Sequence, residues 1–110
     1  MTDRETLELA ARAAGYVFGE YGGKPARQVT TKIGAAWIYW NPREDDGDAL
    51  RLAVYLEFEI DITSTGVAVR TRCGLKVLVN KTEEPDPCTA TRLAITRAAA
   101  EIGRQMEVTK

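Results

Sequence analysis

The sequence predicts an α+β domain with a mainly antiparallel sheet of about four strands and about three helices, in the order α-β-β-α-β-β-α. Two observations predict this class. Apolar residues recur at helical spacing near both ends of the chain, whereas intervening segments alternate apolar and polar residues with a period of two. Turn signals interrupt the alternating segments, which favours antiparallel hairpins over long strands.

The chain of 110 residues is long enough for one hydrophobic core but too short for two, so we expect a single domain spanning residues 1–110. The charge is segregated although the net charge is −1. The segment Glu44–Asp61 has seven acidic residues and one basic residue, Arg51. The segments Tyr21–Arg43 and Ile62–Thr82 have no acidic residue. Ordinary solvated faces explain this segregation more simply than a binding field does.

The sequence has no histidine, which removes the commonest general base and the commonest metal ligand. Cys73 and Cys88 lack zinc-site spacing, and no secretory signal accompanies them, so we expect free thiols in a reducing cytoplasm. No apolar run approaches the length of a membrane span. We therefore expect a cytoplasmic protein without a metal or cofactor.

The first helix begins at a capping box formed by Thr2 and Glu5. Gly15 is placed to end this helix in the left-handed conformation. Its apolar face consists of residues at helical spacing: Leu7, Ala10, Ala11 and Ala14.

Two strands are expected next, one in Tyr16–Tyr21 and one within Gln28–Trp40, with the turn signal "GGKP" between them. The second strand ends in side chains that alternate between its two faces: Trp37, Ile38, Tyr39 and Trp40. Apolar residues on both faces imply cover on both sides, either by helices of the same chain or by a partner subunit.

The stretch "DDGDALRLAVYLEFEIDI" fits two structures. Every even position from Leu50 to Ile62 is apolar, as in a strand, but thirteen residues exceed the usual strand length. We favour a helix from about Asp46 to Leu56, capped by Asp45 or Asp46, followed by the strand "FEIDI". Its apolar side is expected to contain Leu50, Ala53 and Val54, widened by Leu52, Leu56 and Ala49.

The segment "GVAVRTRCGLKVLVN" alternates again, and Gly74 allows a bulge or a break within it. The turn "TSTG" at residues 63–66 joins it to the preceding strand. One face of this segment carries the following apolar residues: Val67, Val69, Cys73, Leu75, Val77 and Val79.

The last helix begins with Asp86 as the cap and Pro87 at the first helical position. Arg92 and Arg97 lie off its apolar side, and Gly103 weakens its final turn. The packing stripe is expected to consist of Cys88, Ile95, Ala98, Ala99, Ile102 and Met106.

Two segments, "WNPREDDGDALRLAV" (Trp40–Val54) and "DPCTATRLAITRAAAEIG" (Asp86–Gly103), resemble a family of small bacteriophage proteins described as the phage "ABA sandwich" domain. The N-terminal "TDRETLELAARAAGY" is similar in character. The resemblance covers under half of the chain. It implies an α-β-α sandwich encoded by a phage or prophage and acting in the cytoplasm of the bacterial host. It implies no catalytic residues.

The residues offer little for catalysis, and we do not expect an enzyme. Asp45, Asp46 and Asp48 resemble the start of a calcium loop, but the glycine and the terminal glutamate that such a loop requires are misplaced. Helix capping explains these aspartates better. Cys73 could be a nucleophile only beside a base, and the commonest base is missing.

The favoured function is therefore a non-enzymatic phage accessory protein that binds a host protein or protein complex, with inhibition of a bacterial defence system as one candidate role. A homodimer is the next use for the extra apolar face. Aromatic and acidic groups make up the candidate interaction residues: Trp37, Tyr39, Asp45, Asp46, Asp48, Glu57, Glu59 and Asp61.

Nucleic-acid binding is the alternative. Arg70, Arg72 and Lys76 share the even-numbered face of one predicted strand. Further basic residues could extend this surface, and tyrosines could stack on bases. These additional candidates are Lys24, Arg27, Lys32, Tyr16, Tyr21 and Tyr39. The pI near 5.5 and the lack of a recognisable nucleic-acid motif count against this alternative.

Overall fold

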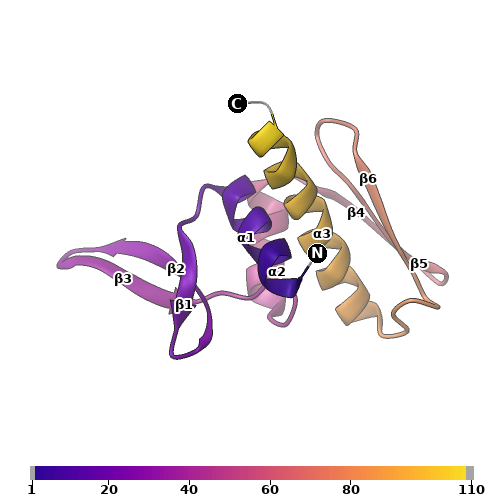
Figure 1. Ribbon diagram of the computed structural model, residues 1–110. Coiled ribbons are helices and arrows are strands. Elements are labelled where there is room, and N and C mark those ends of the chain that lie inside the picture. Colours follow the sequence, from indigo (N-terminus) through magenta and orange to yellow (C-terminus); the bar gives the residue numbers. More distant parts are fainter. Residues whose placement is uncertain (1, 109–110) are drawn as a thin grey trace.

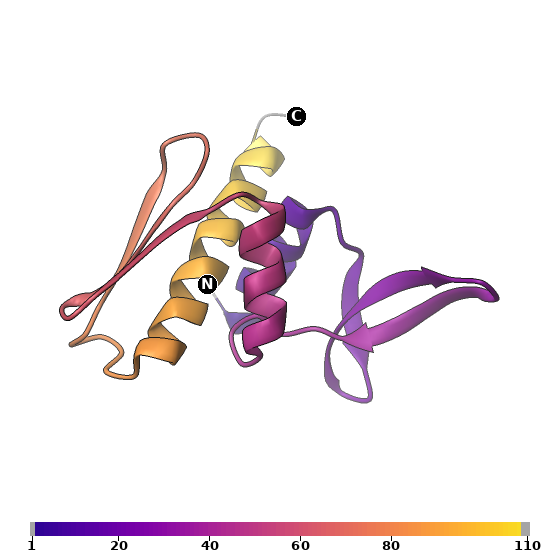
Figure 2. The same cartoon turned by 180° about the vertical axis from the view of Figure 1, so that it is seen from behind.

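Three helices lie between two separate three-stranded antiparallel sheets in the computed structural model, which describes residues 2–108 (Figure 1). The elements follow in the order α1 (Asp3–Ala14), β1 (Phe18–Tyr21), β2 (Lys24–Thr31), β3 (Gly34–Tyr39), α2 (Asp46–Tyr55), β4 (Glu59–Thr63), β5 (Gly66–Arg70), β6 (Lys76–Asn80) and α3 (Pro87–Val108). The view from behind shows the same arrangement, with the hairpin β2–β3 projecting away from the helices (Figure 2).

The α+β class, the three helices and the antiparallel pairing are confirmed, but there are six strands instead of about four. Both long alternating segments are hairpins. The segment 28–40 turns at Lys32 and Ile33, and the segment 66–80 turns between Arg70 and Lys76, where Gly74 has φ 90°. Gly74 therefore marks a turn between two strands. A short turn lets the alternation continue, so the pattern alone reads as one strand.

The order of the layers also differs from an α-β-α sandwich, because the helices occupy the middle of the molecule (Figures 1 and 2). Helix α3 packs against α1 and α2 and against β5 and β6. The sheet β1–β3, which we call the arm, contacts the helices mainly through β1 and the residues flanking it. The second sheet is therefore covered on one face by α3, and most of the arm is uncovered.

Helix α1 has the predicted caps. The Thr2 side chain accepts from the Glu5 N–H at 3.1 Å, and the Thr2 hydroxyl donates to Glu5 Oε1 at 3.1 Å. Gly15 ends the helix with φ 75°, and its N–H bonds to carbonyls of the last turn. The predicted apolar face is buried in full: Leu7, Ala10, Ala11 and Ala14.

Helix α2 and strand β4 confirm that the ambiguous stretch is a helix followed by a strand. Asp45 is the N-cap, and its carboxylate accepts from the Asp48 N–H at 2.7 Å. Glu57 takes φ 57° where the helix ends and the chain turns into the strand. The predicted apolar side is wrong at Leu50 and Val54, which are exposed, and right at Ala53 and at the flanking Leu52 and Ala49. The buried side consists of Ala49, Leu52 and Ala53.

Small residues bring α1 and α3 close together. Gly103 is buried, and a Cβ at this position would collide with the backbone carbonyl of Leu9 in α1. Because glycine has no Cβ, Gly103 permits close packing of the two helices. The interpretation of Gly103 as a residue that weakens the last turn missed this role. The predicted stripe on α3 is buried at Ile95, Ala98 and Ala99. Its two ends, Cys88 and Met106, are exposed.

Helix α3 begins as predicted, with Asp86 accepting hydrogen bonds from Thr89. The Thr89 hydroxyl donates to Asp86 Oδ2 at 2.7 Å and the Thr89 N–H at 2.8 Å. The hydroxyl bond first, and then the backbone bond, lowers the pKa of Asp86 below its ordinary value. A carboxylate with a lowered pKa in the folded state stabilises the protein above its unfolded pKa, and this contribution disappears as the pH falls through the folded pKa.

We therefore predict that Asp86→Ala lowers the Tm at neutral pH and that the difference from the unmodified protein shrinks as the pH falls below about 4. Asp86→Asn is the matched control, since its side-chain oxygen can still cap the helix but cannot titrate. Thermal melts at several pH values measure both variants. A Tm difference for Asp86→Ala that stays constant down to pH values well below the aspartate range would contradict the assignment.

Candidate functional site

The outer side of the arm carries three aromatic rings. The register pairs Tyr21 with Lys24 and Trp37 with Gln28, and aligns Tyr39, Ala26 and Gly19 in a row across the three strands. Directly paired residues in an antiparallel sheet point to the same face. Tyr21, Trp37 and Tyr39 therefore share one face, which we call the aromatic face.

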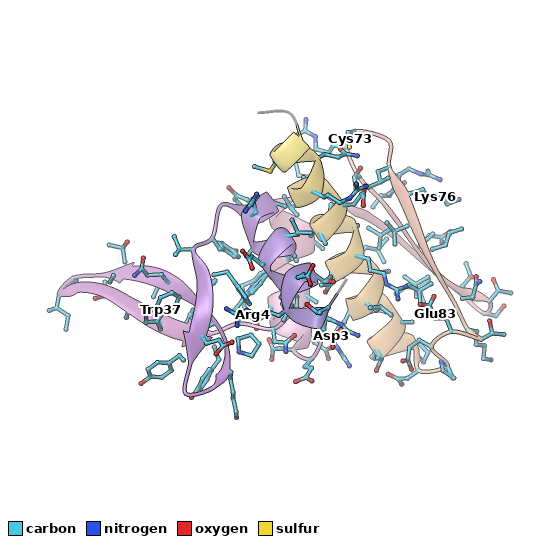
Figure 3. All side chains as sticks on the ribbon, viewed as in Figure 1. Asp3, Arg4, Trp37, Cys73, Lys76 and Glu83 are labelled. Atoms are coloured by element: carbon cyan, nitrogen blue, oxygen red, sulfur yellow. The ribbon has the colours of Figure 1, made fainter. Side chains whose placement is uncertain are left out.

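The Trp37 ring extends over its own sheet. A Cβ added to Gly19 would lie 2.8 Å from Cη2 of Trp37, so the ring reaches from β3 across β2 to β1. Ala26, on the strand between them, is completely buried. Trp37 itself is 37% exposed, and it lies across the helices from Cys73 and Lys76 (Figure 3). One side of the ring thus covers the small residues Gly19 and Ala26, and the rest remains open to contact.

The two tyrosines complete this face. The rings of Tyr21 and Tyr39 are tilted with centroids 5.6 Å apart, and Lys24 Nζ lies 5.6 Å from the Tyr39 ring centroid. The only acidic residue of β1–β3 is Glu20, which points to the opposite face and pairs with Arg4 of α1. The strand residues of the aromatic face therefore include no acidic side chain, and the face has a positive margin at Lys24.

The arm has further uncovered apolar groups at its tip and on its other side. Ile33, in the turn between β2 and β3, is 98% exposed. Ile38 is also exposed and lies on the face opposite Trp37. The prediction that both faces of this segment are covered is therefore wrong within the single chain, except at Trp40. That residue is buried against Tyr16 and Phe18.

The predicted aspartates come together at the start of α2, where each has a structural bond. Asp45 caps the helix, and Asp46 receives a bond from the Arg92 guanidinium at 2.6 Å. Asp48 accepts from the Asn41 N–H at 3.0 Å and from Arg51 at 2.9 Å. Arg92, which the sequence placed off the packing stripe, also donates to the Arg43 carbonyl and so ties α3 to the segment before α2. These bonds explain the cluster without catalysis.

The other predicted acidic residues, Glu57, Glu59 and Asp61, are exposed on or beside β4. The predicted basic residues lie on the same outer face. Arg70 is 3.9 Å from Glu59, and Arg72 is 2.6 Å from Glu57. Lys76 pairs with Arg70 on the adjacent strand.

Opposite charges therefore alternate over the sheet β4–β6, and their fields largely cancel within a Debye length. Lys24, Arg27 and Lys32 cannot extend this basic face, because they belong to the arm on the other side of the helices (Figure 1). Arg27 is also occupied on the inner side of the arm, where its guanidinium lies 4.2 Å from the Tyr16 ring centroid. The predicted basic surface is thus divided between two distant places.

A second uncovered apolar surface was missed by the sequence reading. A groove of about 470 Å³ runs between α2, β4 and α3, lined largely by apolar side chains. Leu50, Ile62 and Cys88 are exposed along it. Leu50 on α2 could have indicated this groove, but its place on the apolar side of the helix also fits a buried helix face.

Charged and apolar side chains line another concave place of the described chain. A depression of about 510 Å³ between α1, α3 and β6 contains charged groups that are paired with one another or with neighbours. Asp3 pairs with Arg43, and Arg97 lies 2.6 Å from Glu83. Within residues 2–108, no group of acidic or cysteine side chains is arranged to hold a metal ion.

The two cysteines are exposed free thiols. The Thr71 hydroxyl, followed by the backbone of Leu75, lowers the pKa of Cys73 below its ordinary value. The Cys73 sulfur lies 3.1 Å from the Thr71 hydroxyl. Among the helices of the described residues, none is long and apolar enough to cross a bilayer.

The fold and the aromatic face define a small α+β protein whose arm projects from the helices and carries exposed aromatic side chains. The chain matches no protein-family model, no curated protein and no solved structure. The resemblance to phage proteins therefore stays a prediction.

Proposed function

We propose that this chain is a non-enzymatic phage accessory protein that binds a host protein through the aromatic face of its arm. One observation carries the proposal: Trp37 and Tyr39 are 37% and 56% exposed on the outer side of the arm, which residues 2–108 leave uncovered. Tryptophan and tyrosine contribute most per residue to protein interfaces, because they bury a large area at little cost in side-chain entropy. The phage resemblance supports a component of a bacterial defence system as the partner.

The charged surfaces are less available to a partner, because their groups are already paired within the chain. On the sheet β4–β6, a partner that bound the acidic or basic side chains would have to break their existing ion pairs. The aspartates of α2 are engaged in capping and in ion pairs. Burying the apolar area of the aromatic face is favourable by roughly 25 cal/mol per Å², and Lys24 beside Tyr39 lies at its margin.

We predict that the double variant Trp37→Ala/Tyr39→Ala retains its fold but loses capture of its partner from bacterial lysate. At about 2 kcal/mol or more for a central aromatic residue, each substitution lowers the affinity at least about 30-fold. Leu50→Ala/Val54→Ala is the matched control, because it removes the same number of exposed apolar side chains from α2. Equal capture by the arm variant and the unmodified protein would remove the proposal.

Nucleic-acid binding is the second candidate, favoured by Lys24 beside Tyr39 and by the lack of carboxylates on the aromatic face. Bases could stack on Trp37 and the tyrosines, with Lys24 contacting phosphate. The same capture experiment separates the two. Protein binding survives nuclease treatment of the lysate and moderate salt, whereas nucleic-acid binding is lost with nuclease and weakens steeply with salt.

A further inference from the structure

The free edge of β3 has properties that the other sheet edges lack. Strand β3 lies at the edge of the arm, in the order β1-β2-β3. Its sequence, "GAAWIY", contains no charged residue and no proline. Each of the other edge strands in the described chain carries at least one charge: Glu20 in β1, Glu59 in β4 and Lys76 in β6. Charges on edges discourage pairing with another chain, so β3 is the unprotected edge.

The backbone groups of this edge can be assigned from the register. The Trp40 N–H donates to the Pro25 carbonyl at 3.0 Å. Because backbone groups alternate in direction along a strand, even-numbered residues of β3 bond to β2. The N–H and C=O groups of Ala35, Trp37 and Tyr39 therefore point to the free edge, where a further strand could bond to them.

The side chains of this edge are complementary to themselves. Along Gly34–Trp40, small residues precede Trp37 and large ones follow it. Antiparallel pairing about a two-fold axis at Trp37 would place Ala35 opposite the partner's Tyr39 and Ala36 opposite the partner's Ile38. Ile38 and Tyr39 then each meet an alanine of the partner, and Trp37 meets its own copy at the axis. The Trp37 ring does not obstruct this pairing, because it reaches back over β2 to Gly19.

We propose that two copies of the chain pair through β3 to form a continuous six-stranded sheet with the aromatic face on one side. With the axis at Trp37, odd-numbered residues of one copy pair with odd-numbered residues of the other. These are the residues whose backbone groups point to the free edge, so the hydrogen bonds between the copies can form. A six-residue strand is a small interface, so the dimer forms only at elevated protein concentration. The inference goes beyond the proposed function, since it uses the edge of the arm and leaves the binding of a host protein to its face.

Sedimentation of the purified protein from about 10 μM to about 1 mM, the range in which small interfaces associate, tests the dimer. The mass is expected to rise from that of the 12.1 kDa monomer towards twice this value. Ala35→Lys places a charge at the paired edge of both copies, so it is expected to remain monomeric throughout.

Thr30→Lys is the matched control, because Thr30 is the direct neighbour of Ala35 on the same face but belongs to the central strand. It is expected to dimerise like the unmodified protein, and circular dichroism confirms that both variants are folded. A monomer at every concentration, or dimerisation unaffected by Ala35→Lys, would overturn the inference. Either result leaves the capture by the aromatic face unchanged, so the two proposals fail separately.

Discussion

Replacing Gly103 with alanine is expected to lower the free energy of unfolding by about 3 kcal/mol or more, at the upper end for an overpacked site. In an unconstrained helix interior the same change would stabilise the protein by about 1 kcal/mol. The sign reverses because the added Cβ collides with the Leu9 carbonyl, a backbone group that moves only if α1 moves. Urea unfolding measures the change, and a Tm lower by roughly 10 °C accompanies it.

Gly47→Ala in α2 is the control for helix propensity. A Cβ at Gly47 meets the end of the Arg51 side chain at 3.1 Å and the capping oxygen Asp45 Oδ2 at 3.2 Å, so a small rearrangement offsets part of the gain in propensity. Its effect is expected to stay within about 1 kcal/mol in either direction. If Gly103→Ala stabilises the protein as much as propensity alone predicts, α1 and α3 do not pack as closely as described.

Replacing Trp40 with alanine is expected to cost about 3–5 kcal/mol of the free energy of unfolding, as for other buried aromatic residues. Trp40 is only 2% exposed. Its ring meets Tyr16 at 5.6 Å and Phe18 at 6.1 Å between centroids, both in edge-to-face geometry. Trp40 also belongs to the buried core cluster that includes Leu7 of α1 and Leu52 of α2, so the variant is expected to lose the attachment of the arm first. Denaturant unfolding followed by far-UV circular dichroism measures the cost.

Two further variants keep this prediction informative. Trp40→Phe retains an aromatic ring, so a smaller loss than for alanine is expected even if Trp40→Ala does not fold. Trp37→Ala is expected to cost less than Trp40→Ala, about 1–2 kcal/mol, since its ring packs on Gly19 and 37% of the residue is exposed. Equal losses from Trp37→Ala and Trp40→Ala would mean that both residues belong to the core.

The elements whose ends are determined by local hydrogen bonds could be predicted from the sequence. Thr2 with Glu5, Asp45 with Asp48, and Asp86 with Thr89 all form the expected caps. Each cap depends on residues three positions apart, so no tertiary information is needed. Thirteen residues are too many for one ordinary strand, and this correctly indicated a helix followed by a strand in the stretch Asp45–Ile62.

The arrangement of these elements could not be predicted in the same way. The turn at Lys32 and Ile33 preserves the alternation on both sides, although "TTKIG" with its glycine was an available turn signal. Placing the helices between the sheets depends on which faces meet, and Leu50 and Val54 looked like a buried face. Gly103 acquires its role only through Leu9, a residue distant in sequence.

The candidate site was predicted only in part. Trp37 and Tyr39 share one face as expected, but the sequence could not separate exposed Trp37 from buried Trp40. Tyr21 was considered only as a stacking group, and its place beside Tyr39 follows from the β1–β2 register. The acidic residues looked available because the arginines that bond them, such as Arg92 and Arg72, lie far away in the sequence.

Site-specific photo-crosslinking tests the central claim, that the aromatic face of the arm is the binding surface. A photoreactive phenylalanine analogue is introduced in place of Tyr39 or, as the matched control, Tyr55, which is similarly exposed at the end of α2 (56% and 63%). In bacterial lysate, position 39 is predicted to form a discrete adduct with a host protein, and position 55 is predicted to form none. Adducts from position 55 alone would contradict the claim.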